Sequence, residues 1–506
     1  CLVWFRNDLR FHDNEALLWA HEHAEFVIPV FCFDPRQFET TTHRYKFPKT
    51  GNYRAQFLIQ SVEDLQKTLK EKGSTLLVFN KRPEVTLSSI YDVCKYDAVV
   101  FQKEVTSEET EVEEACELFC TKNKIQFRPI WGSTLYHKDD LPYTVKNCPN
   151  TYTQFRKDVE GRSKIRLEQP MPKLLKHLPP ELTEISEELP SFEKLGLVEP
   201  TVHANTAFPF TGGETSALNR LQSYLWATGA IENYKTTRNG LLGSEYSTKF
   251  SPWLAFGCIS PRRVFFEIRK YEKERVKNDS TYWVIFELLW RDYFRFIAIK
   301  FGNCLFFSGG VKKIRYKWEE DMEKFRKWAD GKTGVPFVDA NMRELLHTGW
   351  MSNRGRQNVA SFLTKDLKLD WRLGAEWFEY LLVDYDVCSN YGNWNYSAGI
   401  GNDPREDRKF NMIKQATDYD PEGAYARTWV PELGGIQGGK IHVPWVLRPG
   451  ELGSIKLGVD YPNPMIVAQE WRRHFDKTKS PGWTVSTKNK QKGIDFYFKS
   501  NTSSHK

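Results

Sequence analysis

Five short apolar runs of strand length alternate with helical patterns at the start of the chain, and this alternation limits the possible folds more than any other feature. The runs are Leu2–Phe5, Phe26–Phe33, Thr75–Phe79, Ala98–Phe101 and Ile125–Ile130. The helical patterns between them are Asn14–Ala24, Asn52–Lys72, Pro83–Lys95 and Glu108–Lys122. Strands that alternate with helices form a parallel sheet covered on both faces. The sequence therefore predicts an α/β N-terminal domain with a five-stranded, doubly wound parallel sheet over residues 1–132.

The rest of the chain has a different pattern. From about Gly161 to Thr211 the sequence becomes rich in proline and mixed charge, which is typical of an interdomain connector that crosses the surface, and we expect this connector over residues 133–211. Helical patterns then follow one another without strand signals, and Ser251-Pro252 and Ser260-Pro261 each predict an N-cap before a proline at the first helical position. We expect a large all-α C-terminal domain over residues 212–430. Residues 431–506 are rich in glycine, proline and polar residues, and we expect a basic tail that is largely disordered.

The net charge of +7 does not by itself indicate nucleic-acid binding. Residues 471–506 hold nine basic and two acidic residues, so this segment accounts for the whole excess. The body of the chain is balanced, and a DNA groove there must be a local basic patch. The sequence predicts no metal site.

Several other function classes are disfavoured. The nine cysteines are scattered without a CxxC motif, which favours free thiols in a reducing intracellular compartment. No GxGxxG motif follows the first apolar run, and no GxxxxGK[ST] motif occurs, so an ordinary dinucleotide or ATP site is not expected. No apolar run is long enough to cross a bilayer. We expect a soluble intracellular protein, with the nucleus favoured and an organelle left open because the N-terminus could be incomplete.

The stretch from Asp370 to Tyr396 has the composition of a ligand site. Asp384 and Asp386 lie close together, Asn390 follows four residues later, and Trp371 and Trp394 flank them. Carboxylates and an amide can match the donors and acceptors at the edge of a flat aromatic ligand, while indoles surround its faces. The alternative is a helix with ordinary aromatic packing and solvated acids.

Three further stretches carry polar groups at helix starts or on one helix face. Tyr234–Pro252 places Ser247, Thr248 and Ser251 before a helix start, which suits a diphosphate, although a well-capped helix explains it equally. Glu287, Trp290 and Arg291 share one face of an apolar helix. This predicts that Glu287 and Arg291 form a buried ion pair rather than an exposed one. In MSNRGRQ, Asn353, Arg354 and Arg356 lie at a helix start, and Arg356 is a natural partner for Asp384.

These motifs together resemble one family. From its first strand to about Tyr425 the chain resembles the photolyase/cryptochrome flavoproteins, most closely the DASH-type cryptochromes. The matching motifs are WFRNDLR, STKFSPWLAFGCISP, ELLWRDYFRF, GKTGVPFVDANMRELLHTGWMSNRGRQ and the stretch that contains NYGNW. Several long motifs in the same order are much more specific than any single pattern.

The resemblance implies that the C-terminal domain binds FAD. Tyr234, Ser247, Thr248 and Ser251 would then hold the diphosphate, and Arg291 and Asn353 would line the pocket. Arg356 with Asp384 would bracket the isoalloxazine, Asp386 would accept from the ring edge, and Asn390 would face N5.

The resemblance also implies a route for electrons. Trp394, Trp371 and Trp318 match the family's electron-transfer triad, which runs from the flavin to the surface. Core packing remains the alternative for each of these tryptophans.

On the substrate side, Glu287 and Trp290 match residues that contact a flipped cyclobutane pyrimidine dimer, and Arg238, Arg354 and Arg408 match phosphate-contacting positions. The chain departs from duplex-repairing relatives at two positions, Gln357 in place of Met and Tyr396 in place of Trp. A more polar, smaller wall grips the dimer less tightly, and this matters most when flipping must break base pairs. We therefore expect light-driven repair of dimers in single-stranded or looped DNA, with weak activity on duplex DNA.

A second chromophore is implied as well. In DASH relatives methenyltetrahydrofolate serves as an antenna, and Glu104 is the candidate contact in this chain. Thr106 and Ser107 stand where some folate-binding relatives have Asn and Glu, which is a departure from the pattern.

The tail contains a possible partner motif. Gln491, Ile494, Tyr497 and Phe498 fit the pattern Q-x-x-[ILM]-x-x-[FY]-[FY], which resembles the motif that binds the sliding clamp, proliferating-cell nuclear antigen. A chance match, a strand that folds back, nuclear import and non-specific DNA contact are the alternatives.

Two main functions remain open from the sequence. The first is a DNA photolyase that acts as a monomer on single-stranded DNA. The second is a blue-light signalling photoreceptor that binds DNA or a protein partner without significant repair. A light-independent flavin reductase is disfavoured because the sequence has no recognisable nicotinamide site.

Overall fold

The computed structural model describes residues 1–403, 405 and 408–475, and within them the chain divides into two compact units. The first unit is Cys1–Lys332 with Asn341–Phe410, and the second is Thr333–Ala340 with the chain from Asn411 onward. In the described ranges no helix is long and apolar enough to span a membrane. All nine cysteines are free thiols, as the sequence predicts.

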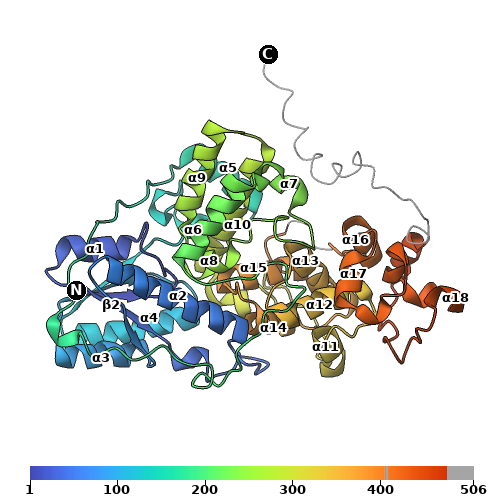
Figure 1. The fold of residues 1–506 in the computed structure, drawn as a ribbon, viewed down its shortest axis with the longest axis horizontal. Helices are drawn as coiled ribbons and strands as arrows, with labels where there is room; N and C mark the ends of the chain where they lie inside the picture. Colours follow the sequence, from blue (N-terminus) through green and yellow to red (C-terminus); the bar gives the residue numbers. More distant parts are fainter. Residues whose placement is uncertain (404, 406–407, 476–506) are drawn as a thin grey trace, which may run out of the picture. The chain divides into compact units, whose positions relative to one another are not determined.

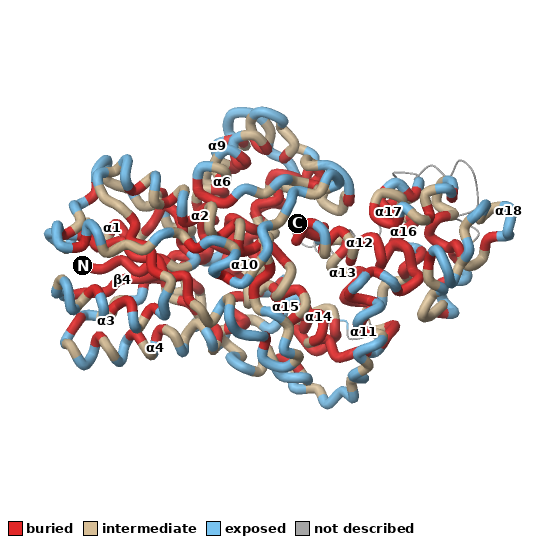
Figure 2. The backbone as a smooth tube through the Cα atoms, turned by 60° about the horizontal axis from the view of Figure 1, so that its bottom comes forward, coloured by how far each residue is buried: buried red, intermediate tan, exposed pale blue. Residues whose placement is uncertain are grey.

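A five-stranded parallel sheet forms the core of the N-terminal part, in the order β3-β2-β1-β4-β5. Its strands are β1 (Leu2–Phe5), β2 (Ile28–Cys32), β3 (Leu77–Phe79), β4 (Ala98–Gln102) and β5 (Gln126–Ile130). The first four are buried along their whole length, because helices cover both faces and apolar side chains on both sides of the strand must be buried (Figure 2). This confirms the predicted α/β class.

Four helices cover this sheet in the doubly wound manner. They are α1 (Glu15–His23), α2 (Asn52–Glu71), α3 (Pro83–Val93) and α4 (Ser107–Lys122). Figures 1 and 2 show α1 and α2 on one face and α3 and α4 on the other. Asn14 caps α1 by accepting a hydrogen bond from the backbone N–H of Leu17 at 3.0 Å.

The segment after β5 packs closely on the sheet. Leu182 is fully buried in the sheet's hydrophobic core, and Val78 on the edge strand β3 pairs with this segment twice. The Val78 N–H donates to the Ser186 hydroxyl at 3.0 Å, and the Glu187 N–H donates to the Val78 carbonyl at 2.8 Å. This pairing covers an otherwise open sheet edge. A helix that the sequence reasoning missed, α5 (Tyr152–Arg162), also lies in this segment.

The remainder of the first unit is helical, as predicted. Its helices are α6 (Glu214–Gln222), α7 (Tyr234–Thr237), α8 (Ser251–Ala255), α9 (Pro261–Glu274), α10 (Asp279–Phe301), α11 (Met322–Ala329), α13 (Asn353–Ser361), α14 (Trp371–Leu381) and α15 (Val387–Ala398). Wider π-helical turns, Ser223–Ala227 and Phe362–Asp366, extend α6 and α13. Another helix, α12 (Pro336–Thr348), crosses the boundary between the two units in sequence.

Buried polar contacts fix the helices to the sheet domain and to the segment that follows it. Asp13 forms an ion pair with Arg262 of α9 at 2.7 Å, and both side chains are buried. Asp292 of α10 accepts hydrogen bonds from the backbone N–H groups of Leu135 and Tyr136 at 3.0 and 2.9 Å. The hydrogen bonds to Asp292 hold α10, which carries Glu287 and Arg291, in a fixed position.

The expectation of a largely disordered segment from residue 431 is wrong for residues 431–475. The second unit contains α16 (Met412–Tyr419), α17 (Ala424–Trp429) and α18 (Pro449–Leu452). Ile441, Val443, Tyr461 and Trp471 are fully buried in it. The segment folds despite its glycine and proline content because widely spaced apolar residues still reach one core. The possible clamp motif at 491–498 lies outside the described residues.

Candidate functional site

A cavity of about 300 Å³ lies among α7, α8, α10, α13, α14 and α15 of the first unit. The predicted residues that line it are Tyr234, Arg238, Ser247, Thr248, Ser251, Glu287, Arg291, Asn353, Arg356, Gln357, Asp384, Asp386, Asn390 and Trp394. The structure thus brings together side chains that are separated by up to 160 positions in the sequence. The remaining predicted residues lie outside its lining: Glu104, Trp290, Trp318, Arg354, Trp371, Tyr396 and Arg408.

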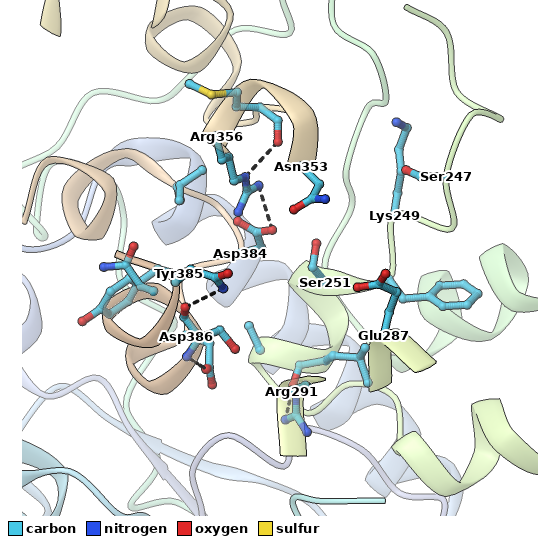
Figure 3. A pocket seen from close by; sticks show the side chains of 18 of the residues that line it. Ser247, Lys249, Ser251, Glu287, Arg291, Asn353, Arg356, Asp384, Tyr385 and Asp386 are labelled. Atoms are coloured by element: carbon cyan, nitrogen blue, oxygen red, sulfur yellow. Dashed lines mark hydrogen bonds and ion pairs between the residues drawn. The ribbon is translucent and has the colours of Figure 1, made fainter. Parts of the chain in front are cut away.

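Arg356 and Asp384 form an ion pair at the wall of the cavity. An Arg356 Nη2 atom lies 2.9 Å from Asp384 Oδ2, and Arg356 Nε donates to the Met351 carbonyl at 2.9 Å (Figure 3). The guanidinium also lies 5.1 Å above the Trp350 ring. Asp384 Oδ1 is buried and has no hydrogen-bond partner among the described residues. Because a buried unpaired oxygen is costly, this atom is suited to accept a hydrogen bond from a ligand.

Asp386 begins α15 and is held in place by it. Its Oδ1 atom accepts from the Ser389 backbone N–H at 2.7 Å, which is an N-cap contact. Its Oδ2 atom lies 3.9 Å from Arg295 Nη1. The carboxylate therefore has a fixed orientation at the cavity wall.

The helix α15 presents one face to the cavity. Asn390, Asn393, Trp394 and Ser397 all line it, and their spacing of three, four and seven residues is that of one helix face. The same spacing could have found Asn393 and Ser397, which were missed. Asn390 Nδ2 donates to the Ala375 carbonyl at 3.0 Å, which leaves its amide oxygen for a ligand.

The loop before α8 forms another wall of the cavity. Arg220 of α6, which the sequence reasoning missed, braces this loop by donating to the carbonyl oxygens of Ser247 and Thr248, both at 3.1 Å. The expectation that Ser251 is an N-cap is wrong, because α8 begins at Ser251 itself and Phe250 occupies the cap position. The Ser251 hydroxyl instead lines the cavity.

Lys249 is an unexpected member of the same loop. It has a positive φ of 56° and is buried, with its amine 3.3 Å from the centre of the Tyr246 ring. Burial lowers the pKa of this amine well below its usual value, while Glu344 opposes the shift. Within the described ranges, Lys249 Nζ has no hydrogen-bond partner. No sequence pattern indicates this residue beyond its position between Thr248 and Ser251.

On α10, two predicted residues face the cavity from successive turns (Figure 3). The expected buried pair of Glu287 with Arg291 is wrong, because Glu287 is partly exposed and pairs with Arg238 of the α7 end at 2.8 Å. An expected dimer contact and an expected phosphate contact therefore hold each other. Arg291 donates to the carbonyl oxygens of Ser133 and Leu254, the latter at 3.0 Å. Burial lowers the pKa of Arg291, and the Asp386 carboxylate opposes this.

Two further predicted DNA contacts lie outside the lining of the cavity. Arg354 donates to Gln357 Oε1 at 2.9 Å and to Asn239 Oδ1 at 3.0 Å, so Gln357 fixes the direction of this guanidinium. Arg408 lies 3.9 Å from Asp403 and packs over the Phe410 ring at 5.1 Å.

Trp290 belongs to an aromatic cluster. It stacks on Tyr152 of α5 with ring centres 3.7 Å apart and an interplanar angle of 8°. Tyr396 meets it edge-on at 5.8 Å. The missed helix α5 therefore supplies the surface on which Trp290 lies.

Two of the three predicted triad members are buried and the third is partly exposed. Trp394 lines the cavity and is buried, Trp371 is fully buried, and Trp318 is partly exposed. Trp394 packs on the backbone of α14 at Gly374, one turn after Trp371. Trp371 Nε1 and Trp318 Nε1 both donate to the Ser308 carbonyl, at 3.2 and 3.0 Å.

Glu104 lies at the end of β4 rather than at the cavity, with 3% of its surface exposed. It forms an ion pair with Arg295, the residue that also approaches Asp386. Asn7 Nδ2 donates to its other oxygen at 3.4 Å. A chain of charges therefore connects Glu104 to the cavity wall.

Comparison with known proteins gives consistent matches along the chain. The family model described as DNA photolyase matches residues 1–176, and the one described as FAD binding domain of DNA photolyase matches residues 283–479. Cryptochrome DASH of Danio rerio is 55% identical over 99% of this chain and 98% of its own length. Cryptochrome DASH of Xenopus laevis is 54% identical over 99% and 98%.

Solved structures show the same likeness. A cryptochrome from Synechocystis sp. PCC6803 has a TM-score of 0.88 and 48% identity, covering 94% of this chain and 98% of that one. A bacterial class III photolyase from Agrobacterium tumefaciens has a TM-score of 0.80 and 29% identity, covering 94% and 96%.

Proposed function

The chain belongs to the photolyase/cryptochrome family, in its DASH-type cryptochrome branch, and from that premise we propose a blue-light-driven repair enzyme. Its substrate is a cyclobutane pyrimidine dimer in single-stranded or looped DNA. Residues 212–430 form the FAD-binding domain, residues 1–132 the antenna domain and residues 133–211 the connector.

The residues of the cavity fit FAD. Asp384 Oδ1 and Arg291 Nε are buried atoms that lack a hydrogen-bond partner in the described part of the chain, and both belong to residues that line the cavity. Their neighbours Asp386 and Asn390 offer further oxygens, while Trp394 and Phe378 supply apolar contact. Such a mixture suits a flat ring with a polar edge.

Each wall of the cavity has its own task in this proposal. Tyr234, Ser247, Thr248 and Ser251, which line the cavity, would hold the diphosphate, and Asn353 and Arg291 would line the pocket. Arg356 and Asp384 would bracket the ring system, Asp386 would accept a hydrogen bond from its edge, and the Asn390 amide would face N5; all four residues line the cavity. When bound and reduced, FAD would supply one electron to the dimer under blue light and regain it after the cyclobutane ring has opened.

The protein's own residues supply electrons and bind the substrate. Trp394, Trp371 and Trp318 form the route by which an external reductant reaches the cavity. Glu287 donates or accepts a hydrogen bond at the dimer, and Trp290 offers a ring face to it. Arg238, Arg354 and Arg408 contact the DNA phosphates.

We attribute the preference for single strands to Gln357, which lines the cavity, and to Tyr396, which lies against Trp290 outside the lining. Gln357 already holds Arg354, and Tyr396 meets Trp290 only by its edge. These two side chains offer a flipped dimer less apolar contact than Met and Trp would. Flipping a base out of a duplex costs a few kcal/mol, and the weaker contact no longer offsets that cost. Repair of duplex DNA is therefore weakened more than repair of single strands.

The observation that carries the proposal is the Arg356–Asp384 pair beside an unpaired carboxylate oxygen in a cavity that also contains Glu287 and Trp394. The test is loss of dimers from an ultraviolet-irradiated oligo(dT) under blue light with a reductant. We expect repair by the wild type and a large loss in Glu287→Gln. A protein that binds FAD and responds to light without removing dimers would instead be a signalling photoreceptor.

We propose methenyltetrahydrofolate as the antenna, with Glu104 as its contact. The support is the position of Glu104 at the end of β4 and its link through Arg295 to Asp386. Reconstitution with methenyltetrahydrofolate, followed by absorption spectroscopy, should give a bound chromophore in the wild type and weaker binding in Glu104→Gln.

We also propose that the protein acts as a monomer, that the nucleus is its location, and that Gln491, Ile494, Tyr497 and Phe498 bind the sliding clamp. This motif lies outside the described residues and rests on its sequence pattern. Calorimetry of a peptide of residues 485–503 with the clamp decides the last point. Absence of measurable binding rejects it.

A further inference from the structure

Tyr391 lies beside the middle member of the tryptophan chain. It is buried on α15, and its ring centre lies 6.1 Å from that of Trp371 at an interplanar angle of 84°. Phe306 packs on its other side at 4.7 Å. The Tyr391–Trp371 distance is comparable to those of the other aromatic contacts in the core, so an electron needs only one short step between the two rings.

The Tyr391 hydroxyl donates to a buried carboxylate. Its partner is Glu379 Oε2 on α14, at 3.1 Å, and Glu379 is 5% exposed. Burial raises the pKa of Glu379 to about 7, while Lys49 and Arg54 oppose the shift. The other titratable groups that face it are Glu108, Tyr385 and Tyr391.

Above pH 7, where Glu379 is mostly ionised, it is a proton acceptor in place before any electron moves. A tyrosine loses an electron readily only when its phenolic proton leaves at the same time, because the protonated radical cation is a very strong acid. A carboxylate with a pKa near neutrality and within hydrogen-bond distance is suited to take that proton.

Trp371 has a different kind of hydrogen-bond partner. Its indole N–H donates to the Ser308 backbone carbonyl at 3.2 Å, and a carbonyl oxygen does not take up a proton at neutral pH. An oxidised Trp371 therefore keeps its proton and remains a strong oxidant toward its neighbours. Trp318 donates to the same carbonyl, whereas Tyr391 donates to a carboxylate that can accept its proton.

We propose that Tyr391 and Glu379 form a proton-coupled side branch of the tryptophan chain. Oxidised Trp371 takes one electron from Tyr391, and the phenolic proton moves to Glu379. The products are neutral Trp371, a Tyr391 phenoxyl radical and a protonated Glu379, so charge and atoms balance. The inference rests on the proposed function, because the initial oxidant is light-excited oxidised flavin, reached through Trp394.

The consequence is an oxidising equivalent that stays inside the protein. On the direct route it reaches Trp318, which is partly exposed and open to reaction with solutes. On the side branch it stays on a buried ring whose proton is retained nearby. Recombination of the oxidised side chain with the reduced flavin is thereby slowed. An external reductant then has time to reduce the oxidised side chain first.

The experiment is time-resolved electron paramagnetic resonance and absorption on the FAD-loaded full chain after a blue flash, with ring-deuterated tyrosine. We expect a tyrosyl radical in the wild type, loss of it in Tyr391→Phe, and a decrease of roughly a hundredfold in its formation rate in Glu379→Gln, as expected when a positioned base is removed. The control is Tyr316→Phe, because Tyr316 lies 4.2 Å from Trp318 and is 46% exposed. The radical should persist in that variant.

A second readout follows the proton. At a pH above 7, where Glu379 starts ionised, infrared difference spectra should show a new protonated-carboxyl band that disappears in Glu379→Gln, and the formation rate should show a solvent deuterium isotope effect. The proton transfer can be tested even if Glu379→Gln binds FAD poorly. Tyr391→Phe removes the proton donor, so it must also remove the protonated-carboxyl band.

The outcomes distinguish failure of the side branch from failure of the proposed function. Loss of the tyrosyl radical in Tyr316→Phe, or tryptophan radicals with no tyrosyl radical in the wild type, overturns the side branch alone. If FAD binds but no tryptophan radical forms after the flash, the proposed electron route fails, and the side branch fails with it.

Discussion

Trp371 and Trp318 donate their indole N–H groups to one shared acceptor, the carbonyl oxygen of Ser308, at 3.2 and 3.0 Å. One backbone oxygen thus fixes the separation of two aromatic rings that come from different parts of the sequence. The shared acceptor also directs its negative end toward both rings, which favours a positive charge on either of them. This geometry makes the pair the best-defined step of the proposed electron route.

Replacement of Trp371 by Phe should interrupt this route. We expect photoreduction of bound FAD to slow by at least about tenfold, since even a modest rise of ~1.4 kcal/mol in the barrier has that effect. The measurement is the rate of flavin bleaching under blue light with a reductant.

The matched control for that variant is Trp328→Phe. Trp328 is also fully buried and lies 6.4 Å from Trp394, but its other ring contacts are Phe325 and Phe378 rather than Trp318. Equal slowing in both variants would indicate a general packing defect and contradict the assigned route.

Gly374→Ala should displace Trp394. A Cβ atom at Gly374 would lie 2.1 Å from the Trp394 ring, so the indole must move toward the cavity. We expect a loss of about 1–3 kcal/mol in the free energy of unfolding and weaker retention of FAD. Urea denaturation and the flavin content of the purified protein measure the two effects.

Gly161→Ala is the control for this substitution. Gly161 lies in α5 with nothing within 4 Å of the added carbon, so alanine should be neutral or stabilise the helix by about 0.5–1 kcal/mol. If Gly374→Ala behaves in the same way, the close packing of Trp394 on α14 is not present in solution.

Asp384→Asn should weaken FAD binding. The carboxylate pairs with Arg356 at 2.9 Å and is nearly inaccessible, so its loss removes a charged hydrogen bond of about 1.5–3 kcal/mol. Titration of the flavin-free protein with FAD should show a dissociation constant raised by about tenfold to a hundredfold.

The control is an exposed ion pair, Glu323 with Lys327 at 2.8 Å on α11. Glu323→Gln should leave the affinity for FAD unchanged, because such surface pairs contribute ~0–1 kcal/mol to stability and none to the cavity. Unchanged affinity in Asp384→Asn would contradict the role given to Asp384.

The buried Glu379 predicts a pH dependence of stability. Its pKa is raised from 4.5 to about 7 in the folded protein, so between these values the unfolded carboxyl ionises while the folded one keeps its proton. The folded state then binds more protons, and its stability falls as the pH rises through this window. The stabilisation of the folded state by this raised pKa is fully present below pH 4.5, where it amounts to about 3 kcal/mol, and it is lost as the pH rises through 7.

Chemical denaturation of the wild type and Glu379→Gln at several pH values isolates this effect. As the pH rises from 4.5 to 7, the free energy of unfolding of the wild type should fall relative to that of Glu379→Gln. Asp292, whose pKa burial also raises to about 7, is common to both proteins and cancels in the difference. A difference that does not vary with pH would show that Glu379 is ionised throughout.

Much of the sheet domain could be predicted from sequence, because buried parallel strands leave continuous apolar runs. The predicted β1 coincides with the observed Leu2–Phe5, and the longer run from Phe26 to Phe33 exceeds the observed β2 by only a few residues. The helix α5 was missed because only Tyr152, Phe155 and Val159 are buried in it, among charged neighbours.

The candidate site could be predicted in part. Arg356 and Asp384 could be paired from their chemistry, and the structure joins them. Sequence could not show that Glu287 holds Arg238 or that Trp290 stacks on Tyr152, because both contacts join helices separated by long segments. Sequence spacing also does not indicate that Trp371 and Trp318 donate to the same Ser308 carbonyl.

The most direct test of the central claim compares repair of one cyclobutane dimer in matched single-stranded and double-stranded oligonucleotides under blue light with a reductant. We predict efficient removal from the single strand and much slower removal from the duplex, with FAD bound in the purified protein. Equal turnover on both substrates would contradict the strand preference. Absence of removal from either substrate by the FAD-loaded protein would contradict the repair function itself.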